Sequence, residues 1–343
     1  MMKGNNTRLI IALLLFIGLG VQFSCTEFHP GNYISLSGLT QGTTYLVTYR
    51  TADSTDYQSG IEELLQEFDM SVSTYQPASL ISKFNSNVGE VHPDRYLREV
   101  FEASRQIYEA SGGAFDITVA PVVNAWGFGF TDPLEVDSSL IDSLLQFVGM
   151  DLVRIEEGIM VKDKGGVMLD VNAIAQGYAV DVVAEFLESE GISNYLVEIG
   201  GEVRTSGVNS RGEYWLIGID KPIDGLQISG LQMEAVVSLS GRSMATSGNY
   251  RRFYVKDGVK YSHTIDPATG YPVQHGLLSA TVIADDCMTA DGFATAFMVL
   301  GLEKSREILK QRKDLEAYLI YNDEQGQYRT FYTRRMRRRL VPQ

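Results

Sequence analysis

The sequence has few of the residues and motifs that build the common metal and nucleotide sites. Its 343 residues include two cysteines, Cys25 and Cys287, and four histidines. The cysteines do not have the spacing of a metal site, and we interpret Cys287 as structural. No Gly-x-Gly-x-x-Gly precedes an expected helix, and no Gly-Lys-Ser/Thr phosphate loop occurs. Gly200 and Gly201 follow an expected strand but open no helix. The usual dinucleotide and nucleotide folds are therefore not supported.

The composition is that of an acidic globular protein. Hydrophobic residues make up 44% of the chain, enough for a large core, and the formal net charge is -14. A protein this acidic repels phosphate backbones, so we expect no nucleic acid partner. An anionic small ligand would need a metal ion, backbone amides or a helix N-terminus to bind here. The length allows one large or two modest domains.

The N-terminus has the pattern of an export signal. Lys3 and Arg8 precede or border an apolar run over residues 9–19, which suits a signal peptide and is short for a membrane span. Ser24 and Cys25 follow this run and resemble a lipoprotein cleavage site, although an incidental cysteine after an ordinary signal peptide is the alternative. We expect residues 1–24 to be a signal peptide, residues 25–38 a lipid-anchored linker and residues 39–343 the folded domain. The exported protein would then be a membrane-anchored lipoprotein that faces the periplasm.

Hydrophobic periodicity predicts an α+β protein with antiparallel sheets. Strand pairs and hairpins, rather than single strands, separate the expected helices, which argues against a doubly wound parallel sheet. Strands are predicted at residues 43–49, 195–199, 215–220, 235–239 and 277–284, and a hairpin at residues 152–163 with its turn at Glu157-Gly158. Helices are predicted at residues 61–68, 97–111, 139–147, 173–189, 290–300 and 303–310. The basic segment 334–339 is expected to be a solvated edge strand, with a membrane-surface role as the alternative.

Four polar segments with glycines lie between the regular elements and contain the candidate chemistry. They are residues 111–118, residues 169–177, residues 243–250 with 263–267, and residues 285–295. In the last segment Asp291 and Thr295 are four residues apart on an expected helix, so they share one face. A carboxylate and a hydroxyl suit Mg²⁺, which prefers oxygen ligands and completes its shell with water and substrate phosphates. Spacing alone leaves open that Asp291 only stabilises the helix N-terminus and that Thr295 is packed.

Asp170 and His263 each have two interpretations. Asp170 precedes an expected helix, where an aspartate commonly caps the first turn, and holding a ligand is the alternative. His263 stands before the turn pair Asp266-Pro267 and can serve as a general base near neutral pH. A lone histidine is more often structural, so its position alone does not decide between these roles.

The order and spacing of these segments resemble the bacterial FAD:protein FMN transferase family, the ApbE-like flavin transferase lipoproteins. The resemblance extends from residue 42 to residue 301, and its motifs are weak singly and strong together. The motifs are Gly113-Ala-Phe-Asp-Ile-Thr118, residues 169–181, Met244-Ala-Thr-Ser-Gly-Asn-Tyr250, His263-Thr-Ile-Asp-Pro267 with Thr269-Gly270-Tyr271-Pro272, and Ala290-Asp291 with Ala294-Thr295-Ala296. Residues 39–343 are then expected to be a flavin transferase domain.

The resemblance implies a tunnelling-type fold with two related α+β halves and an FAD cleft between them. It implies Mg²⁺ held by the Ala173 carbonyl and the side chains of Asp291 and Thr295, with His263 and Asp291 as catalytic residues. Flavin contacts are implied at Gln41, Tyr75, Ala114, Phe115, Asp116, Asp170, Gln176 and Ile265. Two of these depart from the family pattern, which often has methionine in place of Gln41 and in many members lysine in place of Gln176. A glutamine at position 176 can still donate hydrogen bonds.

The implied reaction transfers FMN from FAD to a threonine or serine hydroxyl of an acceptor protein and releases AMP. His263, or a nearby carboxylate such as Asp266, would accept the hydroxyl proton. The implied acceptors are membrane-bound redox subunits that carry flavin and face the periplasm. Two alternatives stay open, an FAD pyrophosphatase in which water replaces the hydroxyl and a non-enzymatic flavin-binding lipoprotein. The presence of both Asp291 and Thr295 argues against the second.

Overall fold

The largest sheet of the protein has eight antiparallel strands. The computed structural model describes residues 32–129, 134–223, 232–250, 253–256 and 259–342. The sheet order is β1-β2-β5-β6-β9-β12-β13-β14, and every neighbouring pair is antiparallel. Its strands are β1 (Asn32–Thr40), β2 (Thr43–Thr51), β5 (Tyr195–Ile199), β6 (Glu202–Ser206), β9 (Arg242–Gly248), β12 (Leu277–Ala284), β13 (Glu316–Asn322) and β14 (Tyr328–Tyr332).

Smaller elements complete the described chain. Three two-stranded sheets are formed by β3 (Val153–Glu156) with β4 (Ile159–Lys162), β7 (Trp215–Asp220) with β8 (Met233–Leu239), and β10 (Phe253–Lys256) with β11 (Val259–Ser262). The helices are α1 (Gln58–Val72), α2 (Leu80–Asn85), α3 (Arg95–Ser111), α4 (Ala120–Ala125), α5 (Ser138–Leu145), α6 (Ala175–Ser189), α7 (Cys287–Gln311) and α8 (Arg334–Arg339).

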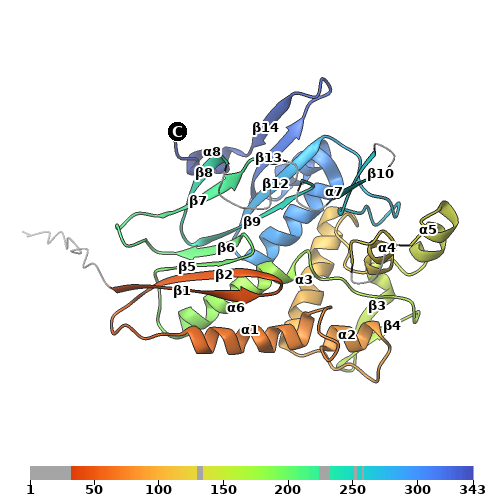
Figure 1. Ribbon diagram of the computed structural model, residues 1–343, viewed down its shortest axis with the longest axis horizontal. Helices are drawn as coiled ribbons and strands as arrows, with labels where there is room; N and C mark the ends of the chain where they lie inside the picture. The colour runs from red at the N-terminus through yellow and green to blue at the C-terminus, as the bar shows by residue number, and fades with distance from the viewer. Residues whose placement is uncertain (1–31, 130–133, 224–231, 251–252, 257–258, 343) are drawn as a thin grey trace, which may run out of the picture. The chain divides into compact units, whose positions relative to one another are not determined.

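The large sheet consists of two halves with the same order of principal elements. In the first half β1 and β2 precede α6, which leads into β5 and β6. In the second half β9 and β12 precede α7, which leads into β13 and β14. Pairing of β6 with β9 joins the halves, and Figure 1 shows α6 beside β5 and α7 beside β9 and β12. This arrangement confirms the predicted α+β fold of two related halves.

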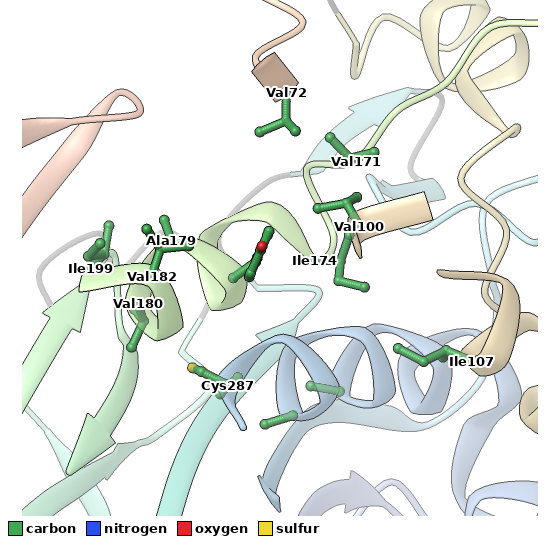
Figure 2. Packing of buried hydrophobic residues seen from close by; sticks show 14 of the residues in the cluster. Val72, Val100, Ile107, Val171, Ile174, Ala179, Val180, Val182, Ile199 and Cys287 are labelled. Carbon is green, nitrogen blue, oxygen red and sulfur yellow. The ribbon is translucent and has the colours of Figure 1, made fainter. Parts of the chain in front are cut away.

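The main core lies between the sheet and the two long helices. Buried side chains such as Tyr45 and Val47 on β2, and Val197 and Ile199 on β5, alternate with more exposed ones, as the two-residue period of a strand requires. The helices α6 and α7 pack on this face, and α1 and α3 pack against them. Figure 2 shows side chains from α3, α6 and the start of α7 in this core, with Cys287 among them.

A second buried cluster covers the other face of the second half. On β12, Val282 belongs to the main core and its neighbour Ile283 to the second cluster, because successive strand residues point to opposite faces. The β7–β8 hairpin and α8 close this cluster through the fully buried Val237 and Met336. The prediction of an edge strand at residues 334–339 is therefore wrong. Thr333 caps a short helix there, and burial of Met336 anchors it.

Most predicted elements are confirmed with shifted ends, but the linker boundary is wrong. Residues 32–38 belong to β1, which pairs with β2 from Asn32 to Thr40, so the folded part begins before residue 39. The segment resembled a linker because β1 is an edge strand that buries little besides Leu36. The two helices predicted at residues 290–300 and 303–310 are confirmed, because α7 consists of two helical segments that meet at a kink at Gly301, where φ is 73° and ψ is -178°. The hairpin turn at Glu157-Gly158 has the positive φ values, 51° and 83°, that a two-residue turn of this kind requires.

The predicted signal peptide and Cys25 lie outside the described residues. Within the described ranges, no helix is both long enough and apolar enough to cross a membrane. Cys287 is buried in the main core with its thiol 3.6 Å from the Val203 carbonyl oxygen, in agreement with a structural role.

Candidate active site

Asp291 lies where the two long helices touch. Its side chain is buried, and its Oδ2 accepts a hydrogen bond from the Gly177 N–H of α6 at 3.0 Å. Glycine is required at position 177, because a Cβ there would lie 2.4 Å from the Cys287 carbonyl oxygen and 2.7 Å from the Asp291 Cβ. Burial raises the pKa of Asp291 to about 7, although the Gly177 amide opposes the shift. In the part of the chain that the structure describes, no Lys, Arg or His forms an ion pair with Asp291.

A second buried carboxylate, Asp181 on α6, fixes the start of α7. It accepts hydrogen bonds from the backbone N–H groups of Cys287 and Met288 at 2.9 and 2.8 Å, and from Arg204 at 2.9 Å. Burial raises the pKa of Asp181 to about 7, against the effect of Arg204 and the two amides. Asp181 thereby sets the position of Asp291, which follows Cys287 by about one helical turn.

The N-terminus of α7 does not depend on Asp291. Asp286 is the N-cap and accepts a hydrogen bond from the Thr289 N–H at 2.7 Å. Asp181 accepts hydrogen bonds from the N–H groups of Cys287 and Met288, the two residues before Thr289. The alternative interpretation of Asp291, as a residue that only stabilises the helix end, is therefore wrong. Its carboxylate points to the contact with α6 instead.

Thr295 connects α7 to the strand below it. It lies about one turn after Asp291 on the same helix face, and its hydroxyl is 3.0 Å from the Ser247 hydroxyl of β9. The next residue back on β9, Thr246, shares a hydrogen bond of 2.9 Å with Thr281 of β12. The motif at residues 244–250 is thus largely the strand under the candidate metal ligands. Sequence analysis did not single out Ser247 as a contact of Thr295.

The motifs at residues 113–118 and 169–181 lie side by side. Val119 and Met168 form a parallel bridge, and the Asp170 N–H donates to the Ile117 carbonyl at 2.7 Å. The Asp170 carboxylate accepts from the Asn172 N–H at 2.9 Å, within the loop that precedes α6. Because α6 begins after Ile174 with no side-chain cap, the interpretation of Asp170 as a helix cap is wrong.

Asp116 is held rigidly within the first of these motifs. It is 7% exposed and accepts hydrogen bonds from the Thr118 N–H at 2.8 Å and from the Thr118 hydroxyl at 2.5 Å. Burial raises the pKa of Asp116, and the Thr118 bonds oppose that shift. Its neighbours Ala114 and Phe115 are buried as well.

The motif at residues 263–272 lies against α4 and the residues that follow it. The Trp126 Nε1–H donates to the Gly270 carbonyl at 2.8 Å, and the His263 ring meets the Phe128 ring edge-on at 6.4 Å. Ile265 is buried in a small cluster with Val122 and Ile141. Since α4 directly follows the 113–118 motif, the fold brings His263 and Ile265 to the same part of the molecule as Asp116.

Gln41 and Gln176 both lie near the turn between β1 and β2. Gln41 occupies this turn with φ 50°, hydrogen-bonds the Asp69 carboxyl and keeps a buried Oε1 without a partner. A Cβ added at Gly200 would lie 2.8 Å from the Gln176 amide nitrogen and 3.1 Å from the Thr43 Cγ2, so both side chains approach Gly200. The sequence analysis did not assign Gly200, Asp69 or Gly177 to the candidate site. A glycine inside a helix, as at position 177, often marks a close approach of two backbone segments.

Tyr75 is the least enclosed of the predicted flavin contacts. Its side chain is 58% exposed, and its backbone N–H donates to the Ser73 hydroxyl at 3.3 Å. It follows α1, which carries Asp69, so it belongs to the same region as Gln41.

The residues around Asp291 fit a hard divalent cation with few protein ligands. Within the described ranges, no three His, Cys, Asp or Glu residues gather as a metal-binding group. A Mg²⁺ site does not require such a group of three residues, because Mg²⁺ commonly uses one or two carboxylates and completes its coordination with water and substrate phosphates. Asp291 is a buried carboxylate that has no cationic partner among the described residues, Thr295 adds a hydroxyl on the same face, and Ala173 lies in the loop before α6. These donors are all oxygen, as Mg²⁺ prefers.

Comparison with known proteins places this arrangement in a family. The model of the ApbE family matches residues 41–319, most of the folded part. The chain belongs to the ApbE family. The FAD:protein FMN transferases of Vibrio cholerae and Haemophilus influenzae are 36% and 39% identical to it over 305 and 309 residues. These matches cover 86% and 85% of this chain and 90% and 88% of those proteins.

Solved ApbE-family structures share the fold. The flavin transferase ApbE of Vibrio cholerae superposes with a TM-score of 0.81 at 35% identity, covering 91% of this chain and 100% of that one. The apo form of the flavinyl transferase ApbE of Pseudomonas stutzeri gives 0.80 at 32% identity, covering 90% and 96%. The ApbE-family assignment therefore rests on sequence and on fold together.

Proposed function

We propose that this ApbE-family protein transfers FMN from FAD to a threonine or serine hydroxyl of another protein. The observation that carries the proposal is Asp291, a buried carboxylate at the α6–α7 contact with no ion-pair partner in the described chain. Thr295 lies on the same face of α7, and the loop with Ala173 leads into the facing helix. The names of the similar transferases agree with this assignment.

Asp291, Thr295 and the Ala173 carbonyl would hold Mg²⁺. When bound, the ion would supply a Lewis acid that neutralises charge on the pyrophosphate oxygens of FAD. It also explains how a protein of net charge -14 can bind a dianionic substrate, since the ion reverses the local sign of the potential. Asp181 acts as a positioning residue, because its bonds to the start of α7 orient Asp291.

The flavin contacts expected from sequence divide into two groups in the fold. One group surrounds α4 and the loop before α6 and comprises Ala114, Phe115, Asp116, Asp170 and Ile265. The other surrounds the β1–β2 turn and comprises Gln41, Tyr75 and Gln176. Asp291 is joined to both groups through α6, since Gly177 follows Gln176 directly. We assign these residues to FAD binding and orientation.

His263 is our candidate for the general base. Asp266, the other candidate, has both carboxylate oxygens engaged in its own turn, by the Ala268 N–H at 2.9 Å and the Thr269 hydroxyl at 3.2 Å. In the transfer the acceptor hydroxyl oxygen forms a bond to the FMN-side phosphorus and gives its proton to the His263 ring. The phosphorus–oxygen bond of the pyrophosphate bridge breaks, and AMP leaves with the bridging oxygen. Positioning and charge neutralisation provide most of the acceleration in such reactions.

We further propose that the protein acts at a membrane surface in the periplasm. The signal pattern of residues 1–24 and the cysteine at position 25 support export and lipid anchoring. Membrane-bound redox subunits with an accessible threonine or serine are the acceptors that such a location favours. Labelling with radioactive palmitate, compared between the wild type and Cys25→Ala, tests the anchor; incorporation that persists in the variant would refute it.

A direct test uses the purified protein from residue 26 onward. It is incubated with FAD and Mg²⁺, with and without a periplasm-facing membrane fraction, and proteins are separated under denaturing conditions. We expect a fluorescent protein band whose mass increases by one FMN and an equal amount of AMP. AMP and free FMN at the same rate in both samples, with no labelled protein, would identify an FAD pyrophosphatase instead. A tightly bound flavin without any AMP would identify a flavin carrier.

A further inference from the structure

A cavity of about 680 Å³ lies in the second half of the fold, outside the residues assigned to FAD. Its walls come from the ends of β9, β11, β12 and β13, from the segment after the 263–272 motif, and from the residues that follow β7. The volume is in the range typical of specific binding sites for small ligands. The lining residues that the structure describes include no Asp, Glu, Lys or Arg.

The cavity adjoins the proposed transfer centre on two sides. Ser262, in its wall, directly precedes His263. Asn249, also in its wall, comes two residues after Ser247, whose hydroxyl bonds Thr295. A chain segment seated in the cavity would therefore end near the candidate base and near the α7 face that carries the candidate metal ligands.

A hydrogen bond from His275 connects the cavity wall to α7, the helix that carries Thr295. Its Nδ1 accepts from the Leu277 N–H at 3.3 Å, so its Nε2 carries a proton and donates to the Met298 carbonyl of α7 at 2.9 Å. Met298 lies three residues after Thr295, which is less than one helical turn. The cavity wall and the candidate metal ligands Asp291 and Thr295 are therefore both held by α7.

Two polar atoms in the wall are buried without a hydrogen-bond partner. The Ser262 hydroxyl belongs to a side chain only 4% exposed, and the Asn249 Oδ1 is buried as well. The Asn249 amide nitrogen is fixed by the Leu277 carbonyl at 3.1 Å, which leaves Oδ1 as the free acceptor. Buried polar atoms without partners are costly and are normally satisfied by water or a ligand. Both atoms suit N–H donors.

We propose that this cavity binds an extended segment of the acceptor polypeptide next to the hydroxyl that receives FMN. Backbone N–H groups of that segment would donate to Asn249 and Ser262, and its small apolar side chains would contact Pro222 and Leu278. Among the lining residues that the structure describes, there is no Lys or Arg of the kind that binds a phosphate. The inference rests on the proposed function and adds where and how the protein substrate is recognised.

The test measures peptide and FAD dependence separately. The probes are short synthetic peptides with one central threonine and randomised neighbours, screened with the wild type, FAD and Mg²⁺ for covalent flavin fluorescence. Gln274→Trp fills the cavity from an exposed lining position. Gln106→Trp on α3 is the matched control, because Gln106 is equally an exposed glutamine but lies far from the lining in the chain. Ser262→Ala removes one hydrogen-bonding group with little change of volume.

We expect Gln274→Trp to raise KM for the best peptide at least ten-fold and to leave KM for FAD unchanged. Ser262→Ala should raise the peptide KM about five-fold, the value of one ordinary hydrogen bond. Gln106→Trp should change neither constant. If KM for FAD rises with that for the peptide, the cavity belongs to the FAD site and the proposal is wrong.

Two further outcomes would also overturn the proposal. An unchanged peptide KM in Gln274→Trp would place the acceptor elsewhere, and labelling of folded acceptor protein but of no peptide would exclude recognition of an extended segment. Failure of the proposed function itself differs from all of these, because the wild type would then label neither peptide nor folded acceptor protein, whether or not it releases AMP from FAD.

Discussion

Gly177→Ala should disable transfer while leaving the protein folded. The added Cβ would stand 2.4 Å from the Cys287 carbonyl oxygen, whereas ordinary contacts begin near 3.4 Å. Relief requires α6 and α7 to separate by roughly 1 Å, which also displaces Asp291 and the N–H that it accepts from. Displacement of a positioned group by about 1 Å can slow a reaction about 100-fold.

The cost in stability should be much smaller than the loss of activity. Overpacking a core costs about 1–3 kcal/mol, and the better helix propensity of alanine over glycine returns about 1 kcal/mol. We therefore expect a net loss of about 0–2 kcal/mol in the free energy of unfolding. The assay compares transfer rate across a Mg²⁺ series with the thermal midpoint of the same preparations. The rate should fall about 100-fold, and the half-saturating Mg²⁺ concentration should rise.

Gly292→Ala is the control for this experiment. A Cβ at Gly292 would also meet an atom at 2.4 Å, but that atom is the terminal methyl of Ile107, which can rotate away. Gly292 directly follows Asp291, so the control is as close to the site as the test. The transfer rate of Gly292→Ala should stay within a few-fold of wild type. If both variants kept the wild-type transfer rate, or if both lost it to the same extent, the idea that the backbone contact at Gly177 positions Asp291 would be refuted.

Three other variants separate the roles of the buried and polar groups. Asp291→Ala should abolish Mg²⁺-dependent transfer with an unchanged circular dichroism spectrum; flavin labelling at the normal rate would remove Asp291 from the metal site. His263→Ala should lower the single-turnover rate at saturating FAD, and a weaker affinity for FAD with a normal single-turnover rate would mean that His263 only binds substrate. Asp181→Asn should cost about 3 kcal/mol of stability, because Arg204 loses its buried partner, and denaturant unfolding that matches wild type would contradict this.

The sequence predicted the elements with strong periodicity. Residues 195–199 and 277–284 are strands at those bounds, and the long helices α3 and α6 were found because their buried faces repeat every three to four residues. The glycine at position 112 ends α3 in the left-handed conformation, with φ 64°. Features of this kind depend on residues close together in the chain, so they can be predicted without knowledge of distant contacts.

Elements whose stability comes from distant partners were not predicted. The strand β9 contains Ser243, Thr246 and Ser247, a polar sequence that forms a central strand only because β6 and β12 flank it. The helix α8 has five arginines in its six residues and one buried side chain, Met336, so no periodicity could show it. Both cases illustrate tertiary contacts that override local preference.

The two buried aspartates show why spacing in the sequence could not decide between a structural role and a ligand role for a carboxylate. Asp181 and Asp291 both lie in long helices, both are almost fully buried, and burial raises the pKa of each to about 7. The sequence places neither next to an obvious partner. In the fold Asp181 contacts Arg204 and accepts from two backbone N–H groups, which oppose the rise of its pKa, whereas Asp291 receives one N–H and no cation from the described chain. A buried carboxylate is stabilised in its charged form by a nearby cation, and this difference in partners is the reason why we propose Asp291, and not Asp181, as the Mg²⁺ ligand.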